Sequence, residues 1–388
     1  MPNVSPFAGW RYHPDKANAA NVVAPPYDVI GPEEQKELYQ RDPHNVVRVD
    51  FGLEQPGDSK QNNKYSRAAA HLAAWRSDGT LYHDHPSLYV CEQSFDYMGK
   101  SYVRRGFLAR VLLEEFGKGQ VFPHERTLSG PKVDRLVLMR ATRGNLSPVF
   151  GLLADEGGTL VSLIANACPW EPTYTIAEKS GVVNRFWVLD HPGPVQGICE
   201  AASKGGIFIA DGHHRYETAI AYRDEVRAAR KAAGLSCPAM GELESDWIMM
   251  FCVPLNDPGL AIFPTHRLVH DAAKFDAKKL IAGLEKHFSV TEARDDAQLS
   301  AALATEGGKP VFGLVLPEKS YLVALKDFSS MDKRAPKMPE AWRKLDVAAL
   351  HLLILEDLLG IDEGKLLRKE NIVYTRVWDC LLYTSRRG

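Results

Sequence analysis

The sequence predicts a mixed α/β protein, with a main body over residues 1–270 and a smaller α+β portion over residues 271–379. Two observations lead to this fold class. In the first part, short apolar runs rich in β-branched and aromatic residues are interspersed with amphipathic stretches of helical period. After about residue 270, a strand pair and an apolar helix follow one another. We find neither an internal repeat nor a low-complexity tract.

Local patterns predict the elements of the body. Residues 64–78 carry an apolar face with helical spacing. Residues 88–95 and 101–111 flank a glycine-containing loop and predict a β-hairpin. β-branched content predicts a strand over residues 46–51, and Pro32 followed by acidic residues predicts a helix start. We also predict strands over residues 148–153, 185–189, 207–210 and 247–253, and helices over residues 129–143 and 216–233.

The smaller portion contains fewer predicted elements. Residues 277–287 and the apolar stretch 347–359 are predicted as helices, and residues 310–316 and 320–325 as a strand pair.

Composition is that of a soluble globular protein. Of 388 residues, 45% are hydrophobic and 25% are charged, and the formal net charge is −2. A charge this close to zero makes nucleic-acid binding through bulk charge unexpected. The six scattered cysteines contain no Cys-x-x-Cys pair, which favours a reducing compartment over a disulfide framework or a structural zinc site.

Targeting signals are missing from the sequence pattern. The first residues show no basic region followed by an apolar run, so we expect no signal peptide. No apolar stretch approaches the 18 residues or so that a membrane span requires. We therefore expect a cytoplasmic protein without a membrane partner, and the sequence leaves its oligomeric state open.

The most informative segment is residues 207–216, an apolar strand followed by Asp-Gly-His-His-Arg and a helix. Asp211 is predicted as the helix N-cap, and Gly212 would let the backbone approach a ligand. His213, His214 and Arg215 would crowd the first turn, where the helix dipole favours an anion. This pattern predicts a phosphate site. The alternative is a strand–turn–helix corner with solvated polar side chains. Adjacent helical residues point about 100° apart, so a metal site using both histidines is not expected.

Two further segments carry candidate catalytic groups. Asp28 follows Pro-Pro-Tyr on a stiff turn, and a rigid loop can hold a catalytic carboxylate, although the sequence alone slightly favours an ordinary aspartate in a proline turn. His124 and Glu125 are adjacent on a predicted loop and could serve as a general acid–base pair. They lack His-Glu-x-x-His spacing, so zinc is not predicted, and a surface loop of mixed charge is the alternative.

Additional cations could contribute to the same cleft. Arg135 and Arg143 lie at the two ends of the predicted helix 129–143, where they could clamp phosphates or simply be solvated. An apolar run over residues 259–263 is predicted to deliver His266 and Arg267 at a strand end, as a second basic contribution.

Several of these segments together resemble a known family. The chain carries, in this order, residues 24–30, 124–127, 134–136, 147–150, 210–219 and 264–267. This combination resembles the DUF-1015 family of uncharacterised bacterial and archaeal proteins, and the resemblance covers nearly the whole chain. The family name implies no function.

A second resemblance does imply a function. The strand–Asp-Gly-His-His-Arg–helix unit is similar to the ParB/sulfiredoxin-like superfamily, which includes free-serine kinases, sulfiredoxins and ParB partition proteins. The resemblance implies that residues 211–215 bind the phosphates of ATP or ADP, with Mg²⁺. Sulfiredoxin chemistry is not expected, because histidine stands where that chemistry uses a cysteine.

We therefore predict a nucleotide-dependent phosphotransferase that acts on a small hydroxylated metabolite, with serine as the precedent. Arg215, His213 and His214 would neutralise phosphate charge, and Asp28 or Glu125 would act as the base. The alternative is a non-catalytic nucleotide-binding or ParB-like DNA-associated regulatory protein. Against the DNA-associated form, the most basic helical stretch, residues 223–231, is interrupted by acids and predicted to be a solvated face.

The C-terminus departs from the family pattern. Residues 380–388 match nothing in it and resemble what a sequencing adapter encodes. We expect a truncated chain with a non-native tail.

Overall fold

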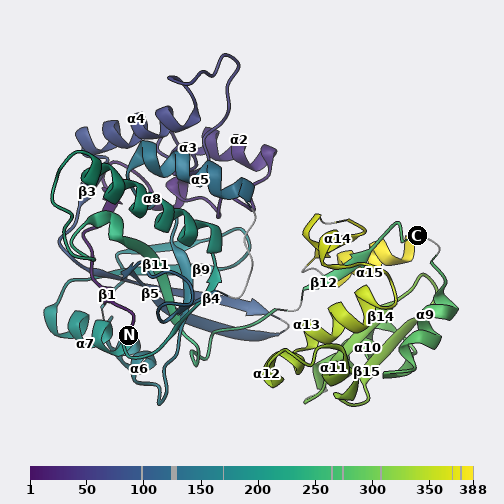
Figure 1. The fold of residues 1–388 in the computed structure, drawn as a ribbon. Helices are drawn as coiled ribbons and strands as arrows, with labels where there is room; N and C mark the ends of the chain where they lie inside the picture. Colours follow the sequence, from purple (N-terminus) through teal and green to yellow (C-terminus); the bar gives the residue numbers. More distant parts are fainter. Residues whose placement is uncertain are drawn as a thin grey trace. The chain divides into compact units, whose positions relative to one another are not determined.

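The computed structural model describes residues 1–97, 99–123, 129–168, 170–263, 265–272, 275–305, 308–368, 370–375 and 378–387. The chain divides into two compact units, Met1–Ala261 and Ile262–Gly388 (Figure 1). The sequence pattern places this division somewhat later, near residue 270. Each unit is described by itself below.

A mixed sheet forms the centre of the first unit and confirms the predicted fold class. In the described part of the chain it has nine strands, in the order β6-β10-β7-β11-β5-β4-β9-β8, with β1 paired to β5. The pairs β6–β10 and β7–β11 are parallel, and the other pairs are antiparallel. The strands are β1 (Val4–Ser5), β4 (Leu88–Tyr97), β5 (Lys100–Leu112), β6 (Val121–Phe122), β7 (Val149–Leu153), β8 (Tyr174–Ala177), β9 (Val183–Leu189), β10 (Ile207–Asp211) and β11 (Trp247–Pro254). A separate pair joins β2 (Trp10–Tyr12) to β3 (Leu81–His83).

Helices cover the sheet and build the core of the unit. They are α1 (Ala19–Val22), α2 (Pro32–Arg41), α3 (Val47–Asp50), α4 (Lys64–Ser77), α5 (Ser129–Thr142), α6 (Thr159–Asn166), α7 (Pro192–Ala202) and α8 (His213–Ala232), with a 3₁₀ turn at Glu244–Asp246. In Figure 1, α4, α5 and α8 lie above the strands, and α6 and α7 lie below them. Side chains from β4, β5, β7, β10 and β11 join α6, α7 and α8 in one apolar cluster.

The hairpin prediction is confirmed, but the strand predicted over residues 46–51 is wrong. Residues Val47–Asp50 form the short helix α3. The Asn45 side chain accepts a hydrogen bond from the Val47 backbone N–H (3.0 Å) and donates to the carbonyls of Asn21 (2.7 Å) and Val23 (3.0 Å). The buried Asn45 side chain thus fixes the turn that leads into α3, and these hydrogen bonds outweigh the β preference of valine.

The second unit contains two small sheets. β13 (Phe288–Ala293), β15 (Ser320–Leu325) and β14 (Val311–Val315) pair in that order, and β12 (His266–Val269) pairs with β16 (Ile372–Thr375). The helices are α9 (Ala277–Leu284), α10 (Asp296–Thr305), α11 (Ser329–Arg334), α12 (Glu340–Arg343), α13 (Asp346–Ala349), α14 (Glu363–Arg368) and α15 (Trp378–Arg387). The predicted strand pair is confirmed.

Two predictions near this unit need correction. The apolar stretch 347–359 is not one α-helix, because α13 is followed by a π-helix, η2 (Leu350–Glu356). Residues 259–263 are not a strand, since the carboxylate of Asp257 accepts a hydrogen bond from the Gly259 N–H (2.9 Å) and turns the chain there.

Within the described residues, no helix has the length and apolar character needed to cross a membrane.

Candidate functional site

The predicted phosphate site lies where β10 ends and α8 begins. β10 runs antiparallel to β7, and its register shifts between Ile209 and Asp211, so that Asp211 pairs with Phe150. A β-bulge of this kind re-aims the side chains that follow it. The predicted role of Asp211 as N-cap is wrong: Gly212 is the N-cap, and α8 starts at His213, three residues before the predicted start.

Gly212 is required by the backbone at this corner. Its φ of +88° lies in the left-handed region, which favours glycine. A Cβ at this position would also lie 2.9 Å from the Nε atom of Arg215. The glycine therefore both makes the turn and leaves room for the arginine.

Arg215 is buried and already bonded to the protein. Its guanidinium donates to the carbonyl of Pro148, the residue before β7, and to the carboxylate of Asp211. The Asp211 side chain is 55% exposed, whereas that of Arg215 is only 10% exposed. The ion pair thus has a buried cationic end and a solvent-facing anionic end.

A second buried arginine, Arg135 of α5, approaches the same corner. Its guanidinium donates to the backbone carbonyl (2.8 Å) and carboxylate (3.2 Å) of Asp50, and to the carboxylate of Asp134 (2.5 Å). The ring of Tyr27 lies over it, with 4.0 Å between the Cζ atom and the ring centroid. Burial raises the pKa of the Tyr27 hydroxyl, and the positive charge of Arg135 partly opposes that rise. The Pro-Pro-Tyr segment is therefore part of this site.

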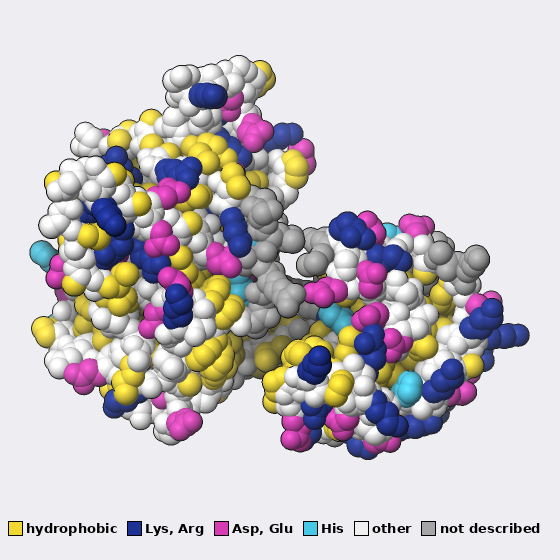
Figure 2. Space-filling model, in the orientation of Figure 1, with side chains coloured by type: hydrophobic (Ala, Val, Ile, Leu, Met, Phe, Trp, Pro, Cys, Tyr) yellow, Lys and Arg dark blue, Asp and Glu magenta, His cyan; other side chains and the backbone are white. Residues whose placement is uncertain are grey.

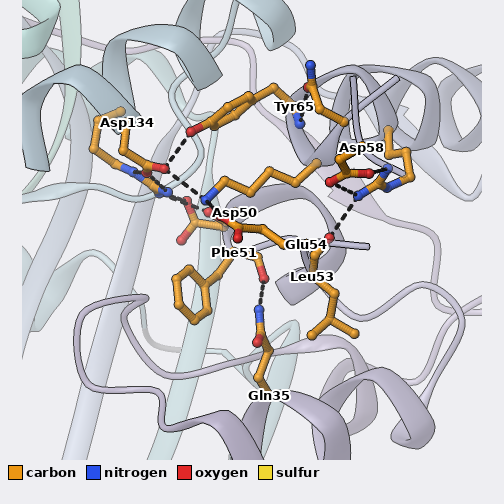
Figure 3. Close-up of polar contacts among 12 residues, drawn as sticks. Gln35, Asp50, Phe51, Leu53, Glu54, Asp58, Tyr65 and Asp134 are labelled. Atoms are coloured by element: carbon orange, nitrogen blue, oxygen red, sulfur yellow. Dashed lines mark hydrogen bonds and ion pairs between the residues drawn. The ribbon is translucent and has the colours of Figure 1, made fainter. Parts of the chain in front are cut away.

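Asp134 extends these contacts into a network between α4, α5 and the chain after α3 (Figure 3). It accepts from the Tyr65 hydroxyl (2.7 Å) and forms an ion pair with Lys64 (3.1 Å). Burial raises the pKa of the Asp134 carboxyl, but the Tyr65 hydrogen bond and the Arg135 charge lower it by more. The network holds the Arg135 guanidinium in place.

Arg135 and Arg215 line one small cavity of ≈ 30 Å³, which is about the volume of one water molecule. Asp50, Ser147 and Thr218 line it too. The Ser147 hydroxyl donates to the Asp50 carboxylate (2.6 Å). The buried Thr218 Oγ1 has no hydrogen-bond partner in the described part of the protein.

The remaining predicted residues of this unit lie in varied surroundings. Asp28 is exposed on a turn closed by a hydrogen bond from the Val29 N–H to the Pro26 carbonyl (3.1 Å). In α8, His213 is buried and His214 is half-buried. His124 and Glu125 lie outside the described residues.

Arg143, which the sequence predicts as a further cation of this cleft, does not line the cavity. It is exposed, directly after α5, with a φ of +51°, and it is not among the residues that line the cavity. His266 and Arg267 belong to β12 of the second unit, so their predicted contribution to this cleft stays a prediction.

Sequence reasoning missed three residues of the site: Tyr27, Asp50 and Thr218. Asp50 falls within residues 46–51, which the sequence pattern wrongly predicts to be a strand. Thr218 lies about one helical turn after the Asp-Gly-His-His-Arg motif. Tyr27 was within a recognised segment, but its neighbour Asp28 drew the chemical interpretation. A pairing of Tyr27 with Arg135 has no signature in the sequence, because the two residues are 108 positions apart in the numbering.

The basic stretch 223–231 of α8 is not simply the solvated face that we predicted. Arg223 is buried and donates to the Leu113 carbonyl (3.1 Å), and Arg227 pairs with the fully buried carboxylate of Asp246 (2.7 Å). Figure 2 shows Lys and Arg side chains interspersed with Asp and Glu over the visible faces. Across the residues that can be described, no group of three or more His, Cys, Asp or Glu side chains could hold a metal ion.

The fold and this site define a mixed α/β protein in which a strand–glycine–helix corner is flanked by two buried arginines. The chain matches the family model described as "Protein of unknown function (DUF1015)" over residues 4–348. It therefore belongs to the DUF1015 family, as its sequence motifs predict. Comparison with curated proteins and with solved structures finds no match.

Proposed function

We propose that this protein is a nucleotide-dependent phosphotransferase acting on a small hydroxylated metabolite, with serine as the first acceptor to test. The observation that supports this most is the convergence of Arg135 and Arg215, from different helices, beside the glycine corner that starts α8. Phosphoryl transfer depends on positioning and on neutralising phosphate charge, which fixed guanidinium groups provide.

The start of α8 is suited to an anion. The helix has 20 residues, and its N-cap, Gly212, has no side chain that could cap the first turn. Helix N-termini carry a partial positive charge and point backbone N–H groups outward. The unsatisfied Thr218 hydroxyl, in the second turn, adds a donor on the cavity side.

The residues also fit a nucleotide with Mg²⁺. Mg²⁺ commonly binds through one or two carboxylates together with phosphate oxygens and water. The exposed carboxylate of Asp211 would provide such a ligand, while His213, His214 and Arg215 would face the phosphates. When bound, ATP or ADP would supply the phosphoryl group that is transferred.

The acceptor hydroxyl needs a base, and Asp28 is the candidate that the described residues favour. Its carboxylate is exposed, and it directly follows Tyr27, whose ring lies over Arg135. Asp28 would take the hydroxyl proton as the acceptor attacks. Glu125, paired with His124, remains the alternative base, and His214 the alternative acid–base group of the first turn.

The DNA-associated alternative has less support, because the most basic stretch of α8 is used within the fold. Arg223 and Arg227 make buried contacts with Leu113 and Asp246 and so cannot act as a recognition surface. Nucleotide binding without catalysis is an outcome that the experiment below distinguishes.

Phosphorus NMR on the purified chain tests the proposal. The protein is mixed with Mg²⁺, ATP or ADP, and a pool of hydroxylated metabolites that includes serine. We expect a new phosphomonoester signal, and we expect Arg215→Ala to reduce its rate of formation by at least about 100-fold, as removal of one charge-stabilising donor does in other enzymes. Circular dichroism confirms that the variant is folded.

Arg140→Ala is the matched control. Arg140 of α5 forms an ion pair with Glu225 of α8, but both side chains are about half exposed and lie outside the cavity lining. Its substitution should leave turnover unchanged. Nucleotide line broadening without any product would favour the non-catalytic alternative, and full activity of Arg215→Ala would refute the site.

A further inference from the structure

The two faces of the large sheet differ in what packs on them. Alternate residues of a strand point to opposite faces. Phe107 of β5 and Met250 of β11 point to the face whose apolar cluster contains α6, α7 and α8. Phe251 of β11 and Phe150 of β7 point to the other face, and they belong to none of the apolar clusters among the described residues. This second face therefore presents aromatic side chains that the core does not use.

The two aromatic rings lie side by side. Phe150 and Phe251 are register partners in the parallel pair of β7 and β11, and their ring centroids are 5.6 Å apart with 30° between the planes. Gly106 of β5 makes room for them, because a Cβ at this position would lie 2.7 Å from the Cε2 atom of Phe251. Both rings are half-buried. They form an aromatic surface on which a planar ligand can stack.

A guanidinium without a carboxylate partner lies over one of these rings. The Cζ atom of Arg104 is 5.3 Å from the Phe150 ring centroid, and its Nη2 donates to the side-chain carbonyl of Gln93. Within the described residues, Arg104 forms no ion pair, its Nη1 donates no hydrogen bond, and its buried Nε has no partner. Burial lowers the pKa of the guanidinium, and the charge of Asp257 acts in the opposite direction. The guanidinium thus keeps donor capacity for a ligand.

A series of hydrogen bonds fixes the position of this guanidinium. The Gln93 Nε2 donates to the Asn184 Oδ1 (2.7 Å), and the Asn184 Nδ2 donates to the Glu178 carboxylate (2.7 Å). Gln93 is the register partner of both Arg104 and Asn184, so the three side chains lie on one face of the sheet. The network holds Arg104 over Phe150 in the free protein, which reduces the ordering that binding requires.

This surface adjoins the glycine corner that starts α8. Phe150 is the register partner of Asp211 in the pairing of β7 with β10. The Cβ atoms of such partners are about 5 Å apart, and the Asp211 carboxylate is exposed. A nucleotide with its phosphates at the start of α8 would therefore have its base within reach of Phe150 and Arg104.

We propose that Phe150, Phe251 and Arg104 form the base-binding part of the site and that they select a purine. The base stacks on the aromatic rings, and the Nη1 of Arg104 donates to the N7 atom that adenine and guanine share. Cytosine presents an amino donor at the corresponding edge, which an arginine cannot satisfy. This inference rests on the proposed function for the nature of its ligand, and it adds the class of base that the ligand carries.

Calorimetry on the purified chain compares ATP, CTP and inorganic triphosphate, each with Mg²⁺. We expect ATP to bind at least about 10-fold more tightly than triphosphate, because a stacked base contributes about that much affinity. CTP should bind more weakly than ATP by about 5-fold or more. Arg104→Gln should remove the preference for ATP over CTP while leaving the affinity for triphosphate unchanged. Arg215→Ala, at the phosphate site, should weaken all three ligands.

Arg110→Gln is the matched control. Arg110 lies on the same strand and the same face as Arg104, and its Cζ is likewise placed over an aromatic ring, 4.4 Å from the Trp247 centroid. It is already paired with Glu244 (3.4 Å), and its variant should bind the three ligands as the wild type does. Should Arg104→Gln not fold, Phe251→Leu provides the same test, with a loss of ATP affinity of about 5-fold and no loss for triphosphate.

Two calorimetric results would overturn the proposal. One is equal affinity of the wild type for ATP, CTP and triphosphate, which would leave the phosphate site standing without a base site. The other is an equal loss of triphosphate and ATP affinity in Arg104→Gln, which would make Arg104 a phosphate contact.

Adenosine separates the base site from the proposed function. If none of the three phosphate ligands binds, the phosphotransferase proposal fails, and saturation-transfer NMR with adenosine decides the base site by itself. Saturation of the purine protons that Arg104→Gln abolishes and Arg110→Gln preserves would support the base site. No saturation in the wild type at millimolar adenosine would refute it.

Discussion

Threonines in two neighbouring helices differ in whether their hydroxyl groups are satisfied. Thr142, at the end of α5, is buried, and its hydroxyl donates to the Leu138 carbonyl (2.9 Å). Thr218 of α8 is equally buried, but its hydroxyl has no partner among the described residues. A buried hydroxyl without a hydrogen bond costs about 1–3 kcal/mol, so its retention beside two arginines suits a ligand contact.

This contrast makes a prediction for matched substitutions. Thr218→Val should leave the free energy of unfolding unchanged or raise it by about 1 kcal/mol, because a desolvated hydroxyl is removed. Thr142→Val should lower it by about 1 kcal/mol, because a hydrogen bond is lost. Urea denaturation measures both. The same Thr218→Val protein should show weaker nucleotide binding; destabilisation equal to that of Thr142→Val would contradict the assignment of an unsatisfied hydroxyl.

Helix α8 connects the site to the rest of the first unit through ion pairs of different burial. At its C-terminal half, the fully buried carboxylate of Asp246 accepts from Arg227 (2.7 Å) and from the backbone N–H groups of Gly241 (2.9 Å) and Leu243 (3.1 Å). Burial raises the pKa of Asp246, but these bonds lower it by more. The exposed pair Arg140–Glu225 joins α8 to α5 with far less desolvation. The buried pair therefore fixes the helix.

We expect the two carboxylates to contribute unequally to stability. Asp246→Asn should lower the free energy of unfolding at pH 7 by about 3 kcal/mol, since it leaves Arg227 without its charge partner, whereas Glu225→Gln should cost less than about 1 kcal/mol. Because the pKa of Asp246 is lower in the folded state, its contribution is present above the unfolded pKa and is lost as pH falls through the folded pKa. The difference between wild type and Asp246→Asn should therefore shrink below about pH 4. Urea titrations across pH measure this, and a pH-independent difference would exclude the ionic explanation.

At the scale of the whole molecule, each unit has apolar clusters of its own. Phe107 lies in the cluster that joins the large sheet to its helices. Phe288 lies in the cluster that joins β13 and β15 to α9, α11 and the π-helix. Both side chains are essentially inaccessible to solvent. Separate cores are the physical basis on which two units of one chain can unfold independently.

Calorimetry on two core variants tests this separation. Phe107→Ala and Phe288→Ala should each cost about 3–5 kcal/mol in the unit that contains the substitution. We expect each variant to lower the midpoint of one thermal transition and to leave the other within error. A single transition that both variants shift equally would show that the two units unfold as one.

The sequence predicts a helix, strand or turn correctly where the contacts that determine that element are local. The hairpin of β4 and β5, helix α4, and the glycine corner before α8 follow from turn and period signals within a few residues. Residues 46–51 had a strand-like composition, yet they are helical because Asn45 bonds to the chain near Asn21 and Val23. No local pattern reports such a contact.

The features of the candidate site likewise divide into those that short segments determine and those that tertiary contacts determine. The sequence by itself determined the family, the mixed α/β class and the Asp-Gly-His-His-Arg corner, because motif order, apolar periodicity and glycine at a left-handed position are properties of short segments. Only the tertiary structure decided that Arg215 bonds to Asp211 and Pro148, that Arg135 lies under Tyr27, and that Thr218 is left unsatisfied. These contacts depend on which helices pack at the same edge of the sheet. Such packing brings together residues that are far apart along the chain, and no local sequence pattern indicates it.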